Sequence, residues 1–123
     1  MPSFGKQSQK KLDECHPDIQ RVLNRAIKII DFSVICGQRS VEDQQIAFRE
    51  GRSELDGITK KSKHNYVPSK AADILPYPAV INGVNVWDDH MRFHILMGVV
   101  MACAHEEGVK LRFGRDRDRD WET

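Results

Sequence analysis

The chain has 123 residues, a length that suits one domain built around a single hydrophobic core. Hydrophobic residues make up 40% and charged residues 30%, a balance that excludes a disordered chain and favours a soluble globular protein. The net charge is only +1, so the sequence lacks the basic excess of nucleic-acid-binding proteins, and we expect no nucleic-acid partner.

The sequence also lacks the features of secreted and membrane-inserted proteins. Its first residues, MPSFGKQSQKK, contain no apolar segment of a secretory signal peptide. The longest apolar stretch, ILMGVVMACA, is much shorter than the roughly 20 residues that cross a bilayer, so we expect no membrane insertion. Three widely spaced cysteines, Cys15, Cys36 and Cys103, have apolar neighbours and are predicted to be buried free thiols of a reducing compartment.

The first half of the chain predicts two helices and a strand. Residues 16–30, HPDIQRVLNRAIKII, place apolar side chains at helical spacing, with Pro17 in the first turn. Residues 32–36 alternate and are rich in strand-forming types. Residues 40–51 begin with a capping-box pattern at Ser40 and end at a glycine, which predicts a short helix.

The second half begins with a predicted long polar loop over residues 52–69, and long loops in compact domains are often functional. AADIL, residues 71–75, predicts a short buried strand, and INGVNV, residues 81–86, predicts a hairpin at its Asn-Gly pair. Residues 87–108 predict the longest helix, which is apolar on most sides and therefore central. Residues 109–113, VKLRF, predict a last strand.

Capping signals bound the long helix, with Asp88 expected at its start and Gly108 at its end. Helices and strands follow one another in a mixed order. We therefore predict an α+β fold in one domain over residues 1–123, with a small, mainly antiparallel sheet packed against about three helices.

The stretch SKHNYVPSKAADILPYP, residues 62–78, holds one histidine and one aspartate that suit a metal site. Zinc binds histidine nitrogen and carboxylate oxygen, and a catalytic zinc site keeps one position open. Asp73 lies in a predicted buried strand, where an ionised carboxylate requires a partner, and a metal shared with His64 is one such partner. The alternative is that Asp73 accepts hydrogen bonds from backbone amides and His64 is a solvated loop residue.

Three further residues are candidates for binding. Arg39 follows a predicted strand in CGQRS, where its guanidinium suits a ligand carboxylate or, alternatively, a surface salt bridge. His90 and His94 share one face of the long helix, a spacing that can bind zinc. The glutamate of the H-E-x-x-H protease motif is replaced by Met91, so an ordinary helix face is the alternative.

The tail, GRDRDRDWET, carries acids at alternate positions, namely Asp116, Asp118, Asp120 and Glu122. Alternating carboxylates resemble an oxygen-rich cation loop, although the central glycine of an EF-hand is missing. The intervening arginines favour the alternative of a solvated, self-neutralising charge run.

Together these motifs resemble one family. The sequence contains, in the order seen in phage endolysins of the zinc L-alanyl-D-glutamate peptidase type, FGKQSQKKL, HPDIQRVLNRAI, DFSVICGQRS, EDQQIAFREGRS, SKHNYVPSKAADILPYP and GVKLRFG. These endolysins are relatives of the D-alanyl-D-alanine carboxypeptidases of vancomycin resistance. The resemblance covers nearly the whole chain, and its most specific element is S-x-H followed by A-x-D and a proline-rich turn. It implies a fold of the hedgehog and D-alanyl-D-alanine peptidase type.

The resemblance also implies roles for individual residues. His64 and Asp73 match the first two zinc ligands. Arg39 matches an arginine that holds the substrate carboxylate, and Ser62 matches a serine beside the substrate. The implied reaction is metal-assisted hydrolysis in the stem peptide of peptidoglycan, with a carboxylate as general base. The implied location is the cytoplasm of the infected bacterial host, with action on the cell wall after release.

The sequence departs from the family at its C-terminal end. The family closes its site with a D/E-x-x-H-x-E segment, which supplies the general base, the third zinc ligand and a strand of the sheet. This sequence ends at Thr123 without that pattern, and no histidine follows His105. Two interpretations stay open: a zinc peptidase whose sequence is cut short, or a catalytically inactive relative that binds peptidoglycan peptide or a protein partner. A separate metal site at His90 and His94 is a third.

A missing strand exposes a sheet edge, which predicts a homodimer or strand exchange in which a partner chain supplies the missing ligand. The tail differs from relatives as well, because Arg115 and Arg117 stand where relatives have a glycine and an aromatic residue. Some relatives carry a calcium-responsive acidic loop there, so Asp116, Asp118 and Asp120 are candidate calcium ligands beside the expected zinc.

Overall fold

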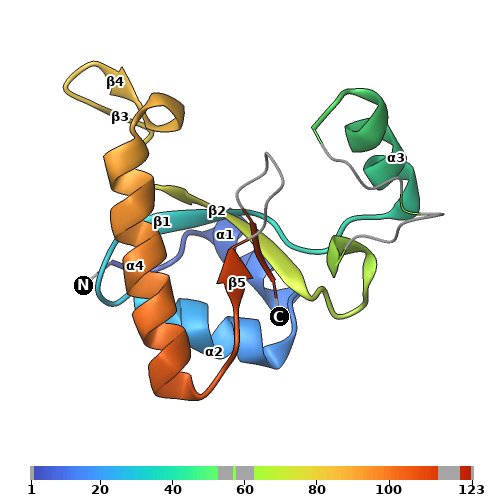
Figure 1. Ribbon diagram of the computed structural model, residues 1–123, viewed down its shortest axis with the longest axis horizontal. Coiled ribbons are helices and arrows are strands. Elements are labelled where there is room, and N and C mark those ends of the chain that lie inside the picture. The colour runs from blue at the N-terminus through green and yellow to red at the C-terminus, as the bar shows by residue number, and fades with distance from the viewer. Residues whose placement is uncertain (1, 53–56, 58–62, 114–119, 123) are drawn as a thin grey trace.

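The computed structural model describes residues 2–52, 57, 63–113 and 120–122. The helices formed by these residues are α1 (Lys6–Asp13), α2 (Pro17–Ala26), α3 (Val41–Arg49) and α4 (His90–Glu107), as Figure 1 shows. The strands are β1 (Phe32–Cys36), β2 (Ala71–Pro76), β3 (Val80–Ile81), β4 (Val84–Asn85), β5 (Arg112–Phe113) and β6 (Asp120–Glu122). Short 3₁₀ turns lie at Lys63–Asn65 and Val86–Asp88. Of the described helices, none has the length and apolar character needed to cross a membrane.

The main sheet is antiparallel, with the strand order β1-β2-β6-β5, so β2 and β6 are its inner strands. Strands β3 and β4 form a separate hairpin. Its turn residues Asn82 and Gly83 have φ values of 51° and 80°, as the predicted Asn-Gly turn requires. The predicted α+β fold with a small antiparallel sheet is confirmed.

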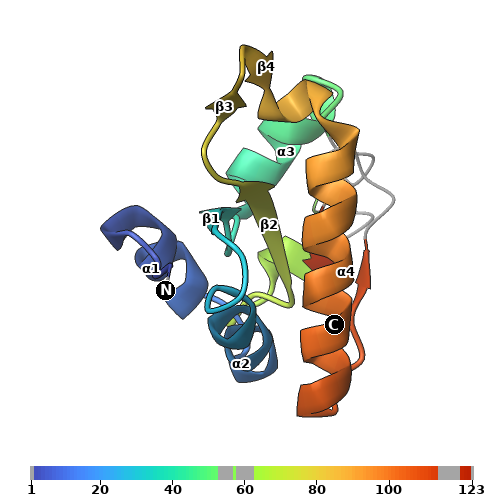
Figure 2. The same cartoon turned by 90° about the vertical axis from the view of Figure 1, so that its left-hand side faces the viewer.

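The hydrophobic core lies where α2 and α4 pack together against the sheet. Its largest buried side chains include Leu12, Ile19, Val22, Leu23, Leu96 and Val100. Figure 2 shows α1 on one side of strands β1 and β2 and α4 on the other. In Figure 1, α3 stands apart from the other helices, across from the β3–β4 hairpin.

Helix boundaries follow the predicted caps with one exception. Ser40 Oγ accepts a backbone N–H three residues into α3 at 3.1 Å, and Gly108 ends α4 with φ of 69°. The prediction of Asp88 as the N-cap of α4 is wrong. Asp88 belongs to the 3₁₀ turn that precedes the helix, and Asp89 Oδ1 accepts the N–H of Arg92 at 3.3 Å instead.

Two elements lie where no helix or strand was predicted. Helix α1 occupies the polar N-terminal segment, and β6 occupies part of the charged tail, where it pairs with both β2 and β5. Asp120 is the first residue of β6, whereas Asp116 and Asp118 lie outside the described residues. The strand predicted over residues 109–113 is shorter in the structure, where only Arg112–Phe113 form β5.

Candidate metal centre

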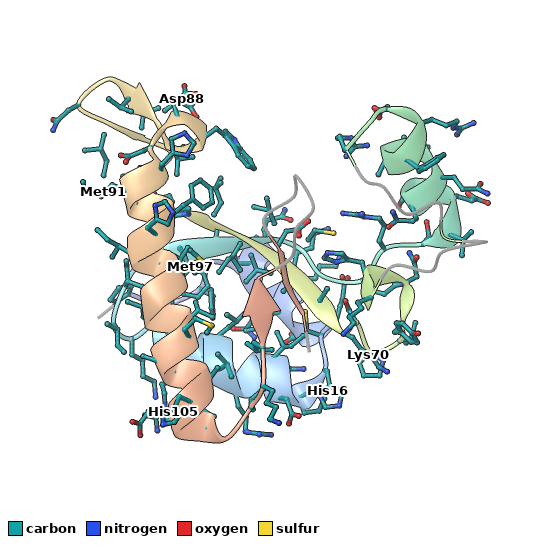
Figure 3. The ribbon with its side chains drawn as sticks, in the orientation of Figure 1. His16, Lys70, Asp88, Met91, Met97 and His105 are labelled. Atoms are coloured by element: carbon teal, nitrogen blue, oxygen red, sulfur yellow. The ribbon has the colours of Figure 1, made fainter. Side chains whose placement is uncertain are left out.

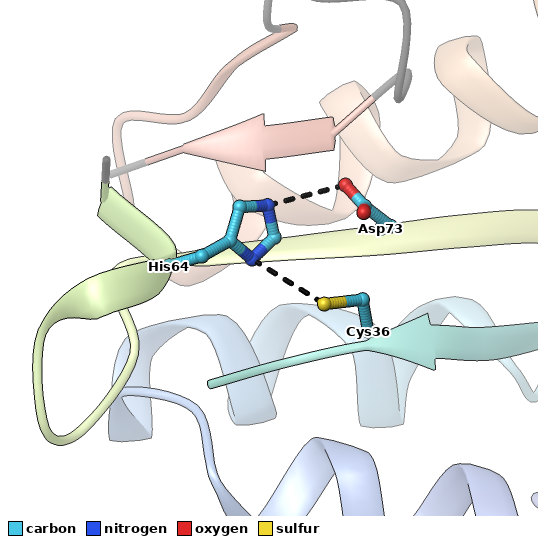
Figure 4. A group of neighbouring side chains, drawn as sticks. All are labelled: Cys36, His64 and Asp73. Carbon is cyan, nitrogen blue, oxygen red and sulfur yellow. Dashed lines mark hydrogen bonds and ion pairs between the residues drawn. The ribbon is translucent and has the colours of Figure 1, made fainter. Parts of the chain in front are cut away.

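Strands β1 and β2 and the 3₁₀ turn that precedes β2 bring together three side chains of the types that bind metals. Cys36 ends β1, Asp73 lies within β2, and His64 lies in the 3₁₀ turn that precedes β2. One ligand atom from each side chain lies within 4.8 Å of the other two. Figure 4 shows the imidazole of His64 between the Asp73 carboxylate and the Cys36 sulfur. Among residues 2–52, 57, 63–113 and 120–122, this is the one such group of three.

A register shift in the sheet places Cys36 opposite Asp73. Strands β1 and β2 pair regularly up to Val34 and Ile74, and then the register shifts by one residue. An unshifted ladder would place Cys36 opposite Ala72, on the other face of β2. Because directly paired residues share a face of an antiparallel sheet, the shift brings the thiol to the same face as the carboxylate.

The orientation of His64 assigns its proton. Its Nδ1 lies 2.7 Å from the carbonyl oxygen of Gly37, which can only accept, so Nδ1–H is the donor. The neutral ring then has its lone pair on Nε2, which lies 3.2 Å from Asp73 Oδ1. A histidine ring that donates from one nitrogen to a carbonyl and presents the other is the usual arrangement of a metal-binding histidine.

Backbone hydrogen bonds fix the turn that carries His64. The N–H of Arg39 donates to the His64 carbonyl at 2.7 Å, and Asn65 Nδ2 donates to the Arg39 carbonyl at 2.9 Å. The Lys70 N–H donates to the Lys63 carbonyl at 3.0 Å. These contacts join the turn to the segment after β1, so His64 is held in place although it lies in a polar connection.

Ser69 supports the carbonyl that orients His64. Its side chain is fully buried, and its hydroxyl lies 2.7 Å from the Ala71 carbonyl and 3.2 Å from the Gly37 carbonyl. The same oxygen accepts the N–H of Ala71 at 3.2 Å. Ser69 therefore connects the start of β2 to the Gly37 carbonyl behind the imidazole.

Arg39 provides the positive charge beside the buried carboxylate. Its Nη2 lies 3.4 Å from Asp73 Oδ2 and 3.7 Å from Cys36 Sγ, and its Nη1 donates to Gln44 Oε1 at 2.9 Å. The side chain is only 10% exposed, and that of Asp73 is 5% exposed. A buried carboxylate requires such compensation, so Arg39 stabilises and orients Asp73 in this arrangement.

The pair of His64 and Asp73 fits a zinc-type ion. Two ligands of a tetrahedral ion with bonds of 2.0–2.1 Å are separated by about 3.3 Å. The distance of 3.2 Å between Nε2 and Oδ1 agrees with that separation. The donors are an imidazole nitrogen and a carboxylate oxygen, both of which zinc accepts.

Other residues singled out in the sequence are placed elsewhere. His90 and His94 are both exposed on α4 and do not belong to the three-residue group. Figure 3 labels His16 at the start of α2 and His105 in the last turn of α4, and neither belongs to it. Ser62 lies outside the described residues.

Cys36 was not predicted to lie beside His64 and Asp73, as it does in the three-residue group. Cys15 and Cys103 are buried as predicted, and burial raises the pKa of the Cys15 thiol to about 12 and also raises the pKa of Cys103. The prediction that Cys36 is a buried thiol is wrong, because it is only half-buried and lies next to Arg39 and His64. Its place at a strand end, directly before Gly37 and a charged segment, is the sequence signal that distinguishes it.

Comparisons with known proteins agree on one family. A sequence model of the family described as phage L-alanyl-D-glutamate peptidase matches residues 2–123. The L-alanyl-D-glutamate peptidase of Escherichia phage T5 is 36% identical over 115 residues, which cover 92% of this chain and 80% of that protein. The crystal structure of the Serratia marcescens L-Ala D-Glu endopeptidase ChiX matches with a TM-score of 0.76 and 26% identity, covering 98% of this chain and 89% of that one.

Proposed function

Because the chain belongs to the phage L-alanyl-D-glutamate peptidase family, we propose that it hydrolyses the bond between L-alanine and D-glutamate in the stem peptide of peptidoglycan. The observation that carries the proposal is the buried pair of His64 Nε2 and Asp73 Oδ1, 3.2 Å apart, in a chain that the family matches from residue 2 to 123. The reaction class is hydrolysis of a peptide bond by a metallopeptidase.

We propose zinc as the metal, with His64 and Asp73 as two of its ligands. A zinc ion bound there supplies a Lewis acid that polarises the scissile carbonyl. The protein residues prepare the site for it. The Gly37 carbonyl keeps Nε2 of His64 available by accepting a hydrogen bond from Nδ1–H, and Arg39 holds the Asp73 carboxylate toward the imidazole.

Substrate binding is assigned to Arg39 and Ser62. Arg39 lies beside the proposed metal ligands, and a guanidinium suits the free carboxylates of a stem peptide. Ser62 stands two residues before His64 in the sequence, which supports a place near the same substrate. The general base of the reaction is not assigned to a described residue.

The remaining proposals concern partners and location. We propose that the protein acts on the cell wall of an infected bacterium after release from the cytoplasm. We also propose a homodimer formed at the outer strand β5, whose second edge carries no partner among the described strands. Calcium is proposed at the acidic tail, through Asp116, Asp118 and Asp120.

Digestion of purified peptidoglycan tests the proposed function. With added zinc, mass spectrometry is expected to detect stem peptides with a new amino-terminal D-glutamate. Asp73→Asn is expected to remove this product, because it replaces the anionic ligand by a neutral amide. Asp88→Asn, at an exposed aspartate near α4, is the matched control and retains it.

Cleavage at a different bond, or equal yields from the wild type and Asp73→Asn, would overturn the proposal. Retained binding of soluble stem peptides without any cleavage would instead identify the chain as the inactive, peptide-binding relative.

A further inference from the structure

We propose that Cys36 is a third ligand, a thiolate, of the metal ion held by His64 and Asp73. The inference rests on the proposed function, since it concerns the same metal. The family resemblance assigns no role to this cysteine. What points to it is the structure, which places its sulfur within 4.8 Å of ligand atoms of both other residues.

The sheet register is the first argument. A one-residue shift turns Cys36 toward the face of β2 that carries Asp73, and the two residues are direct cross-strand partners. Cβ atoms of such partners are roughly 4.5–5.5 Å apart. At that separation, the thiol of one partner and the carboxylate of the other can both reach one ion that lies between the two side chains.

The weak restraint on the sulfur is the second argument. The contacts of Cys36 Sγ are all long, with 3.8 Å to the Gly37 carbonyl, 3.9 Å to His64 Nδ1 and 3.7 Å to Arg39 Nη2. The thiol lies on the Nδ1 side of the ring, as Figure 4 shows, whereas the proposed metal lies on the Nε2 side. Rotation about one bond, χ1, moves a cysteine sulfur by about 3 Å between staggered rotamers, so the proposal requires Cys36 to change rotamer when the metal binds.

The chemistry of the ligand set is the third argument. On metal binding the S–H bond of Cys36 breaks, a sulfur–metal bond forms, and the proton leaves to solvent. The thiolate and the Asp73 carboxylate together carry two negative charges, which balance a divalent ion. Nitrogen, oxygen and sulfur donors in one site favour zinc or cobalt over magnesium or calcium.

Cobalt spectroscopy on the full chain tests the inference. Titration with Co²⁺ is expected to give visible d–d absorption together with a thiolate-to-cobalt charge-transfer band in the near ultraviolet. In Cys36→Ser the d–d absorption is expected to remain at higher cobalt concentration, with at least ~10-fold weaker binding, while the charge-transfer band is lost. Cys103→Ala, which removes a buried thiol outside the group, is expected to keep the band.

The outcomes separate the two proposals. Cobalt binding by the wild type without a charge-transfer band overturns the assignment of Cys36 and leaves His64 and Asp73 as ligands. An equal cobalt affinity of the wild type and Cys36→Ser overturns it as well. The absence of any cobalt binding by the wild type contradicts the proposed function itself. The wild-type spectrum decides the matter even where the serine variant does not fold.

Discussion

At the scale of single residues, Gly37 meets two demands at one position. Its carbonyl oxygen accepts a hydrogen bond from His64 Nδ1–H, and its Cα lies against helix α1. A Cβ at this position would overlap with the backbone carbonyl oxygen of Lys11 and crowd the side chains of Cys15 and Glu14. The overlap involves backbone, which cannot rotate away, so the close approach of β1 and α1 requires glycine here.

Gly37→Ala is therefore expected to destabilise the protein by about 1–3 kcal/mol, in the range of overpacked sites. It is also expected to weaken zinc binding, because the carbonyl behind His64 is displaced. Chemical denaturation and zinc titration measure the two effects. Gly5→Ala is the control, since a Cβ there meets no atom within 4 Å. Equal stability of the two variants would contradict the packing argument.

Residue types in the sequence made His64 and Asp73 candidate metal ligands with an ordinary structural alternative, and the family resemblance then matched them to zinc ligands. It did not identify Cys36 or Ser69. The place of Cys36 opposite Asp73 depends on a register shift in β1, and the place of Ser69 on a contact with Gly37, 32 residues away in the chain. Both are tertiary relations that local sequence patterns do not contain.

At the scale of elements, α4 involves two glycines, Gly98 and Gly108, that are expected to affect stability in opposite ways. Gly108 ends the helix with φ of 69°, which L-amino acids with a side chain rarely adopt. Gly98 lies inside the same helix, where a Cβ would meet no atom within 4 Å. Figure 3 labels Met97 in the middle of α4, where it packs against the core, and Met91 near the start of the helix. Met91 is 73% exposed.

Gly108→Ala is expected to lower the free energy of unfolding by about 1 kcal/mol, because alanine is strained at positive φ. Gly98→Ala is expected to raise it by about 0.5–1 kcal/mol, because alanine loses less backbone entropy in a helix. Denaturant unfolding of both variants measures the two shifts. Shifts of the same sign would show that the conformation at Gly108 is not the one described.

Elements with a periodic apolar pattern, a long apolar stretch or a clear cap or turn signal were predictable, whereas α1 and β6 were not. Residues of α2 repeat at helical spacing, and β1 was predicted with its observed bounds of residues 32–36. Helix α1 reads KQSQKKLD and buries only Ser8 and Leu12 among its residues, which is too few to give a periodic signal. Strand β6 has three residues and exists because β2 and β5 pair with it on both sides.

At the scale of the whole molecule, the buried thiol of Cys15 makes the free energy of unfolding decrease as the pH becomes alkaline. Burial raises the pKa of Cys15 from 9.0 to about 12, so the folded chain keeps this proton longer than the unfolded chain. Below about pH 9 the thiol is protonated in both states, and its contribution to stability is fully present. Above that pH the unfolded chain ionises first, and the contribution is lost as the pH rises toward 12.

The free energy of unfolding is therefore expected to fall between about pH 9 and 12, by roughly 1.4 kcal/mol per pH unit from this group. Cys15→Ala is expected to start from a lower stability, because a buried side chain is shortened, and to show a shallower decline. Denaturant unfolding across this pH range compares the two slopes. Parallel curves would exclude Cys15 as the source of the pH dependence.

The α+β architecture followed from the order of the predicted elements, because helices and strands that follow one another in a mixed order are typical of that class. The strand order did not follow. It depends on a tail strand that enters the middle of the sheet, and such non-local pairing is not encoded in a local pattern.

Zinc binding measured by isothermal titration calorimetry tests the central claim that His64 and Asp73 hold the metal. The wild type is expected to bind one zinc ion per chain, and His64→Asn to bind it at least ~100-fold more weakly, because the amide lacks the imidazole donor. His94→Asn, on the exposed face of α4, is expected to bind like the wild type. Unchanged zinc affinity in His64→Asn, or its loss in His94→Asn, would contradict this assignment.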